Sequence, residues 1–226
     1  MPTGASLHAS NSRSTPPARH ADEQMRLWIR FTEADLIDRD PYLARMPNPA
    51  ENRRVRLAGT ADAAACAAIY APYVERTAIS FELEPPSATE MAKRIEASLQ
   101  RHAWFVLEQH DAIVGYAYGG PMNRRAAYRF SCEVSVYVAE SHRGAGAGRV
   151  LYEALFARLA ERGYLRVIAG MTLPNAASEA LHRAMGFETV GVYRRIGYKL
   201  GAWHDVEWTQ RSLPAADPAG APPEPR

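Results

Sequence analysis

The feature that most constrains this chain is a strand, a glycine-rich turn and a helix start within residues 133–152. The apolar strand ends at Val138, and glycines stand at positions 144, 146 and 148 before the helix. Glycines lack a Cβ, so backbone N–H groups can approach a ligand closely. The first helical turn adds unpaired N–H groups and the positive end of the helix dipole. We therefore expect this turn to hold phosphate oxygens, although the same pattern also occurs in tight strand–helix connections.

Two common phosphate-binding motifs do not fit this turn. A P-loop requires a lysine and a serine or threonine after its last glycine, whereas Arg149 and a valine follow Gly148. A dinucleotide-binding loop requires a third glycine at the place that Arg149 or Leu151 occupies, depending on where the motif begins. The pattern that remains is Arg-x-x-Gly-x-Gly, starting at Arg143 after a valine-rich strand.

Composition excludes several classes of protein. The 226 residues, 47% of them hydrophobic, suit one domain with additional segments. A net charge of +2 is too small to indicate a nucleic acid or an anionic membrane as main partner. No apolar run is long enough to cross a membrane, and the first twenty residues lack the apolar core of a secretory signal. Cys66 and Cys132 indicate neither a disulfide framework nor a zinc site. We expect a cytoplasmic protein without a metal site and without a nucleic-acid or membrane partner.

The chain divides into three segments. Residues 1–52 are expected to be an N-terminal extension, largely disordered or peripheral, because they are rich in Ser, Pro, Ala and Arg and then interrupted by prolines. Their apolar patch at 25–31 either docks on the domain or follows a true initiation site at Met25. Residues 53–213 form the folded domain, and the Pro- and Ala-rich residues 214–226 are expected to be a disordered tail.

Hydrophobic periodicity predicts the order β-α-α-β-β-β-α-β-α-β-β, a mixed α/β layer fold. Thr60 is expected to cap the first helix, which Pro72 should kink or shorten. Ser87 and Glu90 form the capping box of the second helix. The expected strands are 54–57, 104–108, 113–118, 128–138, 167–169, 187–193 and 203–211, and the last helix should turn Ala177, Leu181, Ala184 and Met185 inward.

Several segments together resemble the GCN5-related N-acetyltransferase (GNAT) superfamily, in particular its phosphinothricin and methionine sulfoximine N-acetyltransferase branch. They are residues 133–138, 143–148, 173–175, 181–187 and 197–206, and the resemblance covers residues 54 to about 213. It implies the GNAT fold, a central mixed sheet flanked by helices, with acetyl-CoA as co-substrate and a homodimeric assembly. The coenzyme would be bound by Val136, Tyr137, Val138, Arg143, Gly144, Ala145, Gly146, Ala147, Gly148 and Asn175.

Acetylation of an amine requires a base, because a protonated amine cannot attack. Glu133 stands in an apolar strand, where a carboxylate needs a reason to exist, and the family's catalytic glutamate falls at this position. The alternative is a half-exposed glutamate paired with an arginine such as Arg129.

His182 is the second catalytic candidate, as proton donor to the leaving thiolate or as a substrate contact. Asn175, Ser178 and His182 are spaced i, i+3, i+7 and therefore share one helix face. From the residues alone, this face is equally well explained as a solvated surface.

The resemblance places Phe81, Arg125 and Tyr128, with Tyr137, around the acceptor. An arginine can clamp an amino-acid carboxylate through two hydrogen bonds, although an arginine in a turn is commonly only a surface residue. A serine triad using His204 is rejected, because the chain has no G-x-S-x-G motif. The implied activity is direct acetyl transfer to a small amino-acid analogue. The alternatives are another amine (a polyamine, an aminoglycoside or a protein N-terminus) and a non-catalytic acyl-CoA-binding module.

Overall fold

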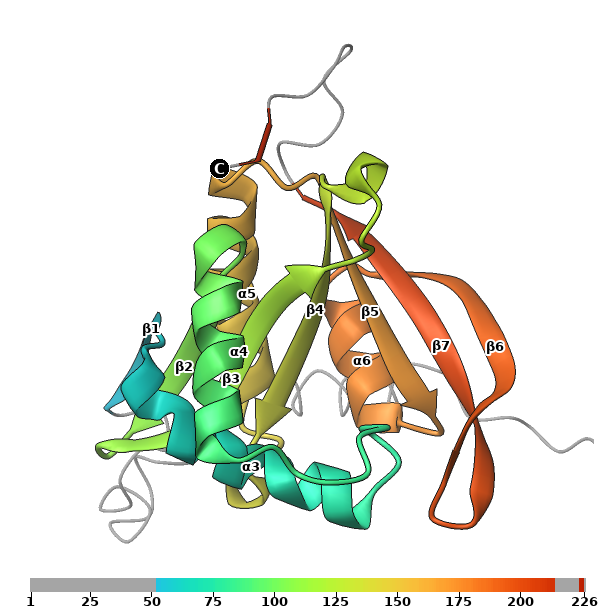
Figure 1. Ribbon diagram of the computed structural model, residues 1–226, viewed down its shortest axis with the longest axis horizontal. Coiled ribbons are helices and arrows are strands. Elements are labelled where there is room, and N and C mark those ends of the chain that lie inside the picture. Colours follow the sequence, from blue (N-terminus) through green and yellow to red (C-terminus); the bar gives the residue numbers. More distant parts are fainter. Residues whose placement is uncertain (1–51, 214–223, 226) are drawn as a thin grey trace, which may run out of the picture. The chain divides into compact units, whose positions relative to one another are not determined.

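The computed structural model describes residues 52–213 and 224–225. These residues form a seven-stranded mixed sheet in the order β1-β2-β3-β4-β5-β7-β6, flanked by helices (Figure 1). The expected fold class and element order are confirmed. Residues 1–51 and most of the expected tail lie outside the described residues, so the predictions made for them stay predictions.

The element bounds are as follows. The strands are β1 Arg53–Leu57, β2 Trp104–Gln109, β3 Ala112–Pro121, β4 Ser131–Val138, β5 Arg166–Leu173, β6 Glu188–Lys199 and β7 Ala202–Ser212. The helices are α3 Ala63–Arg76, α4 Ala88–Arg101, α5 Ala147–Glu161 and α6 Ala176–Ala184, with short 3-10 helices η2 Thr60–Asp62, η3 Ala126–Tyr128 and η4 Glu140–His142. None of the described helices is long and apolar enough to span a bilayer.

Two apolar cores lie on the two faces of the sheet. Helix α5 packs Leu151 and Leu155 against buried strand residues that include Cys132 and Val134 of β4. Helices α3 and α4 pack on the other face, where Tyr137 of β4 joins the core. Because side chains alternate along a strand, Glu133 and Ser135 project to the α3/α4 face together with Tyr137.

The sheet opens between β4 and β5. These parallel strands pair at only three positions, from Ser131 to Glu133 on β4, whereas β4 pairs with β3 and β5 pairs with β7 along their lengths. Beyond Glu133 the two strands separate (Figure 1). The β5-facing edge of β4 therefore presents backbone groups that need other partners. At its far end, the Tyr73 hydroxyl donates to the Val138 carbonyl at 2.6 Å.

Several local predictions were wrong. Pro72 does not shorten helix α3, which continues to Arg76; the carbonyl that Pro72 leaves without a helical partner belongs to Ala68, which is exposed. Thr60 does not cap it; the Asp62 carboxylate accepts the Gly59 N–H at 2.8 Å instead.

Further corrections concern the last third of the chain and the start of β4. Strand β4 begins at Ser131 rather than 128, since η3 precedes it. Strands β5 and β6 extend further than expected. On α6 the prediction is confirmed for Met185, which is buried, and for Leu181, which packs against the apolar core, whereas Ala177 and Ala184 are exposed. His182 is buried as well, so part of the polar face of this helix also points inward.

Ser87 caps α4 as expected, since its hydroxyl accepts the Glu90 N–H at 3.1 Å.

Candidate active site

The glycine-rich turn is open, and several of its amides have no backbone partner among the described residues. Gly144 and Gly146 both have φ of +78°, a left-handed conformation that favours glycine. A Cβ at either position would meet nothing within 4 Å. Within the described part of the chain, the N–H groups of Gly146, Ala147 and Gly148 donate to no backbone acceptor. A helix start with free amides and no side-chain cap is an anion-binding arrangement.

Neighbouring elements hold this turn in place. The Arg53 guanidinium of β1 donates to the Ala145 carbonyl at 2.7 Å. The Arg143 guanidinium lies 4.7 Å from the centre of the Tyr73 ring. Gly148 has a different role from Gly146, because a Cβ there would lie 2.9 Å from Leu181 of α6. The turn is thus fixed by its neighbours, and close packing of Leu181 of α6 on α5 requires its third glycine.

A narrow cavity of about 50 Å³ occupies the gap between β4 and β5. It brings together four of the predicted site residues, Val136, Tyr137, Asn175 and His182, which come from β4 and α6. The other lining residues are Ile79, Val134, Ser135, Tyr152, Ala169, Gly170, Met171 and Ser178. Ile79 and Tyr152 were not predicted from the sequence. Tyr152 follows Leu151, the first residue of the apolar stripe of α5. No signal in the sequence points to Ile79.

Both ring nitrogens of His182 are bound. Its Nδ1–H donates to the Ser178 carbonyl at 2.8 Å, and the Tyr152 hydroxyl donates to Nε2 at 3.2 Å. Because burial lowers the pKa of His182, the imidazole is neutral at neutral pH. In this arrangement it presents no free N–H to the cavity. Asn175 caps α6, its side-chain oxygen accepting the Ser178 N–H at 3.2 Å.

Glu133 stands where the two strands separate. It is the last β4 residue paired with β5, and it lies opposite Gly120 of β3. The alternative pairing with Arg129 is contradicted, because that guanidinium binds Glu224 at 2.8 Å. Among the described residues the Glu133 carboxylate forms no ion pair, and burial raises its pKa. A carboxylate of raised pKa without a cation is suited to accept a proton near neutral pH.

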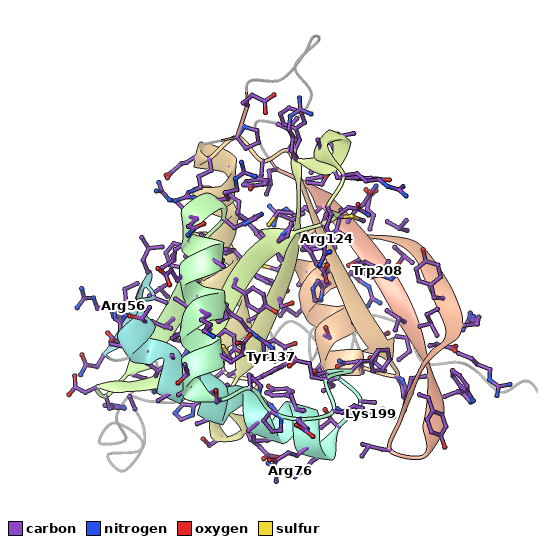
Figure 2. All side chains as sticks on the ribbon, in the orientation of Figure 1. Arg56, Arg76, Arg124, Tyr137, Lys199 and Trp208 are labelled. Atoms are coloured by element: carbon purple, nitrogen blue, oxygen red, sulfur yellow. The ribbon has the colours of Figure 1, made fainter. Side chains whose placement is uncertain are left out.

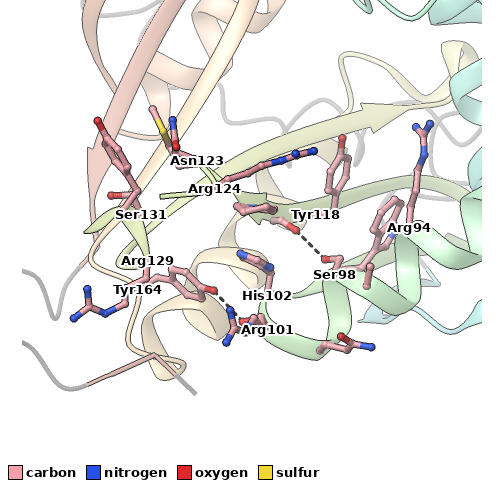
Figure 3. Close-up of a pocket in the computed structure, with 18 of the residues that line it drawn as sticks. Arg94, Ser98, Arg101, His102, Tyr118, Asn123, Arg124, Arg129, Ser131 and Tyr164 are labelled. Carbon is pink, nitrogen blue, oxygen red and sulfur yellow. Dashed lines mark hydrogen bonds between the residues drawn. The ribbon is translucent and has the colours of Figure 1, made fainter. Parts of the chain in front are cut away.

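A larger cavity, of about 520 Å³, lies between α4, the end of β3 and η3 (Figure 3), and Glu133 is a lining residue of neither this cavity nor the β4–β5 cavity. The lining of the larger cavity includes Gly120, the β3 partner of Glu133, and Ser131 on the same strand as Glu133. The predicted acceptor residues Arg125 and Tyr128 line this cavity.

Three of the residues lining this cavity that were not predicted from the sequence carry polar or charged groups that bear on its chemistry. Arg94 and Tyr118 line it, and Arg124 extends across it toward Tyr118 (Figure 3). Only Arg124 carried a sequence signal, as part of a pair of adjacent arginines.

Phe81 lies apart from both cavities. It packs on β6, where a Cβ added to Gly197 would come within 2.2 Å of its ring. The Phe81 and His204 ring centres are 6.2 Å apart. The structure therefore does not bring Phe81 together with Arg125 and Tyr128.

Comparison with known proteins decides the family. The family model of the acetyltransferase (GNAT) domain matches residues 55–208. The chain belongs to the GNAT acetyltransferase family. It is an N-acetyltransferase, as the sequence predicted, and the likeness to the phosphinothricin and methionine sulfoximine branch is confirmed by its relatives.

Three proteins show what this GNAT enzyme is similar to in sequence and in structure. Phosphinothricin N-acetyltransferase of Streptomyces viridochromogenes is 37% identical over 76% of this chain and 91% of the relative. L-methionine sulfoximine/L-methionine sulfone acetyltransferase of Pseudomonas paraeruginosa is 33% identical over 75% of this chain and 98% of the relative. The solved structure of a phosphinothricin acetyltransferase from Sinorhizobium meliloti, in complex with AcCoA, is 34% identical, has a TM-score of 0.72, and covers 76% of this chain and 94% of its own.

Proposed function

We propose that this GNAT enzyme transfers acetyl from acetyl-CoA to the amino group of a small amino-acid analogue of the phosphinothricin or methionine sulfoximine type. The single observation that carries the proposal is the position of Glu133. Its carboxylate, which forms no ion pair with the described residues, belongs to the residue at which β4 and β5 separate, and the β3 partner of that residue, Gly120, lines a cavity bounded by several arginines. The names of the relatives support the choice of acceptor.

The glycine-rich turn, residues 143–148, would bind the coenzyme diphosphate through main-chain amides, chiefly those of Gly146, Ala147 and Gly148. The open β4–β5 gap would receive the pantetheine arm along the backbone of Val136, Tyr137 and Val138, in the manner of an added strand. Asn175 would contact the arm from α6. Acetyl-CoA supplies the activated acetyl group, and the remaining chemistry belongs to side chains of this enzyme.

Glu133 would remove a proton from the acceptor ammonium and so free the nitrogen lone pair. Direct attack is favoured over transfer through an enzyme cysteine. Both thiols, Cys66 and Cys132, are fully buried. Burial raises the pKa of Cys66 to about 12 and raises that of Cys132 as well, so neither is a thiolate at neutral pH.

His182 is the second residue to which we assign a catalytic role in this proposal. Because its N–H is bound to Ser178 and its pKa is lowered, the geometry favours a role through Nε2 over donation of its own proton. The imidazole would hold the Tyr152 hydroxyl at the cavity wall or accept a hydrogen bond from the substrate.

Acceptor recognition would use the arginine-lined cavity. Arg125 is suited to bind the acceptor carboxylate through two parallel hydrogen bonds, with Tyr128 beside it. Phe81 does not line this cavity, and we propose that it contacts the acceptor from the 77–87 loop instead.

A homodimer in the cytoplasm is part of the same proposal. The β6–β7 hairpin exposes an apolar surface, to which Val190, Tyr193, Ile196, Tyr198, Leu200 and Trp203 contribute, each more than half exposed. Exposed apolar patches of this kind commonly mark interfaces. Light scattering on the full chain should give a dimer mass, and Ile196→Glu should shift it to a monomer. A wild-type monomer at all concentrations would remove this part of the proposal.

The test of function is an acceptor panel. Thiol release from acetyl-CoA should be measured with phosphinothricin, methionine sulfoximine, methionine sulfone, a polyamine, an aminoglycoside and an N-terminal peptide, with mass spectrometry of the products. The proposal predicts acetylated amino-acid analogues with the highest kcat/KM. Preference for any other amine would replace the acceptor, and coenzyme binding without transfer to any amine would favour a non-catalytic module.

A further inference from the structure

Lys199, the last residue of β6, is buried although it is a lysine. It is 5% exposed. The tight turn after it, with positive φ at Leu200 and Gly201, pairs it with Ala202 of β7. Its own carbonyl is contacted by His204 Nε2 at 3.0 Å. The main chain of Lys199 is thus fixed in the β6–β7 hairpin.

The Lys199 side chain reaches from the β6–β7 hairpin to the end of α3 and the loop that follows it. Its ammonium donates to the Val74 carbonyl at 2.5 Å and to the Ser80 carbonyl at 2.6 Å. Val74 is in the last turn of α3, where carbonyls lack helical partners and a cation is favoured by the helix dipole. Ser80 lies in the 77–87 loop, which joins α3 to α4. Figure 2 shows Lys199 between this loop and the hairpin.

The same loop is held at its other side by a second set of bonds. Ser80 Oγ and the Tyr70 hydroxyl are 2.6 Å apart, and that hydroxyl also donates to Glu82 at 3.0 Å. The Arg94 guanidinium donates to both Glu82 carboxylate oxygens, at 2.7 and 3.0 Å. The loop is therefore held by α3, α4 and β6, and the Lys199 ammonium provides the bond from β6.

The loop so held contributes directly to the candidate site. Ile79 forms part of the wall of the β4–β5 cavity. Phe81 lies on Gly197 of β6, next to the His204 ring. The loop also reaches the arginine-lined cavity proposed for the acceptor, because Glu82 binds the guanidinium of Arg94, which lines that cavity. A displacement of the loop would therefore move Phe81 off the hairpin and release Arg94 from its carboxylate.

We propose that Lys199 is a positioning residue, which sets the place of the 77–87 loop over the β4–β5 opening and thereby determines acceptor binding. The inference rests on the proposed function. Lys199 contacts neither the glycine-rich turn nor Glu133 in the structure, so coenzyme binding and proton abstraction should be affected less than the acceptor.

The test compares Lys199→Met with Lys93→Met, the chain's other lysine, which is exposed on α4. Lys199→Met keeps the length of the side chain and removes its donors. We expect the KM for the acceptor to rise about tenfold, which corresponds to about 1.4 kcal/mol, with the KM for acetyl-CoA changed less than about threefold. Hydrogen exchange in the 77–87 loop should accelerate. Lys93→Met should leave all three measurements unchanged.

Tyr70→Phe serves as a second variant in case Lys199→Met does not fold. It removes the hydroxyl that binds Ser80 and Glu82, and we expect the same pattern with a smaller rise in acceptor KM. An unchanged acceptor KM in folded Lys199→Met, with or without faster loop exchange, would overturn the inference. Equal rises in both KM values would also overturn it, since they indicate a general loss of structure.

Loop exchange separates this inference from the proposed function. If the wild-type enzyme acetylates no amino-acid analogue, the proposed function fails, and the acceptor that it does use replaces the analogue in the KM measurement. Unchanged exchange in the 77–87 loop of Lys199→Met would refute the positioning role independently of any activity.

Discussion

At the scale of the residue, the structure separates carboxylates that stabilise the fold from one that does not. Asp62 accepts two hydrogen bonds from Arg56, at 2.7 and 2.8 Å, and its pKa is lowered by them. Glu133 has no such cation among the described residues, and burial raises its pKa. A side chain that costs stability and is placed at an opening in the sheet is better explained by chemistry than by folding.

These opposite shifts predict opposite effects on stability. A raised carboxyl pKa means that the native state loses stability as pH rises through the ordinary glutamate range, whereas a lowered one means that stability is lost as pH falls. At pH 7, Glu133→Gln should therefore have a Tm equal to or above that of the wild type. Asp62→Asn, the matched control, should have a lower Tm. Thermal unfolding followed by circular dichroism checks both, and a clear drop in Tm for Glu133→Gln would contradict the account of its environment.

At the scale of the element, the sequence predicted the order and the type of helices and strands but not the residues at which several of them begin and end. The strand, glycine turn and helix around Gly146 were predictable because each step has a local signature. Pro72 was misjudged because its cost depends on whether the freed carbonyl reaches solvent. The inward face of α6 was misjudged because alanines carry no strong preference, while His182 is buried by its bonds to Ser178 and Tyr152.

The candidate site was predictable to a smaller extent, for the same reason. Residues near the glycine turn and on β4 are consecutive in sequence. Arg94 and Lys199 act through partners 12 and 119 residues away. No local pattern announces such contacts, so only the three-dimensional structure reveals them.

The turn itself can be tested by adding one methyl group. Gly146→Ala places an L-residue at φ +78°, which costs about 1–2 kcal/mol, and the loop should relax away from its present backbone. We expect a KM for acetyl-CoA raised by about tenfold or more. Gly201→Ala is the control, because that hairpin glycine has φ of +77° and equally open surroundings. It should lower stability similarly while leaving the KM for acetyl-CoA unchanged; equal KM values for both variants and the wild type would argue against the turn as the diphosphate site.

At the scale of the whole molecule, two buried histidines make folding sensitive to acid. Burial lowers the pKa of His102 to about 4 and lowers that of His182. Both remain neutral in the fold while the unfolded chain takes up protons near pH 6.5. Their contribution to the free energy of unfolding is complete above about pH 6.5 and is lost as pH falls toward 4.

The Tm of the wild type should accordingly fall between pH 7 and pH 5, and His102→Gln should show a shallower fall. His102 stacks on Tyr164 with ring centres 5.2 Å apart, so the variant should have a lower Tm at pH 7. Differential scanning calorimetry at half-unit pH steps measures the slope. Parallel slopes for the two proteins would show that His102 does not contribute.

The proposed activity depends most on Glu133 as the base, next to a coenzyme held by the glycine turn. The decisive measurement is acetyl transfer by Glu133→Gln at pH 7, with acetyl-CoA affinity determined on the same protein by calorimetry. We predict unchanged acetyl-CoA affinity and a kcat lower by about 10²–10⁴-fold. A Glu133→Gln enzyme that binds acetyl-CoA and turns over at the wild-type rate would contradict the central claim.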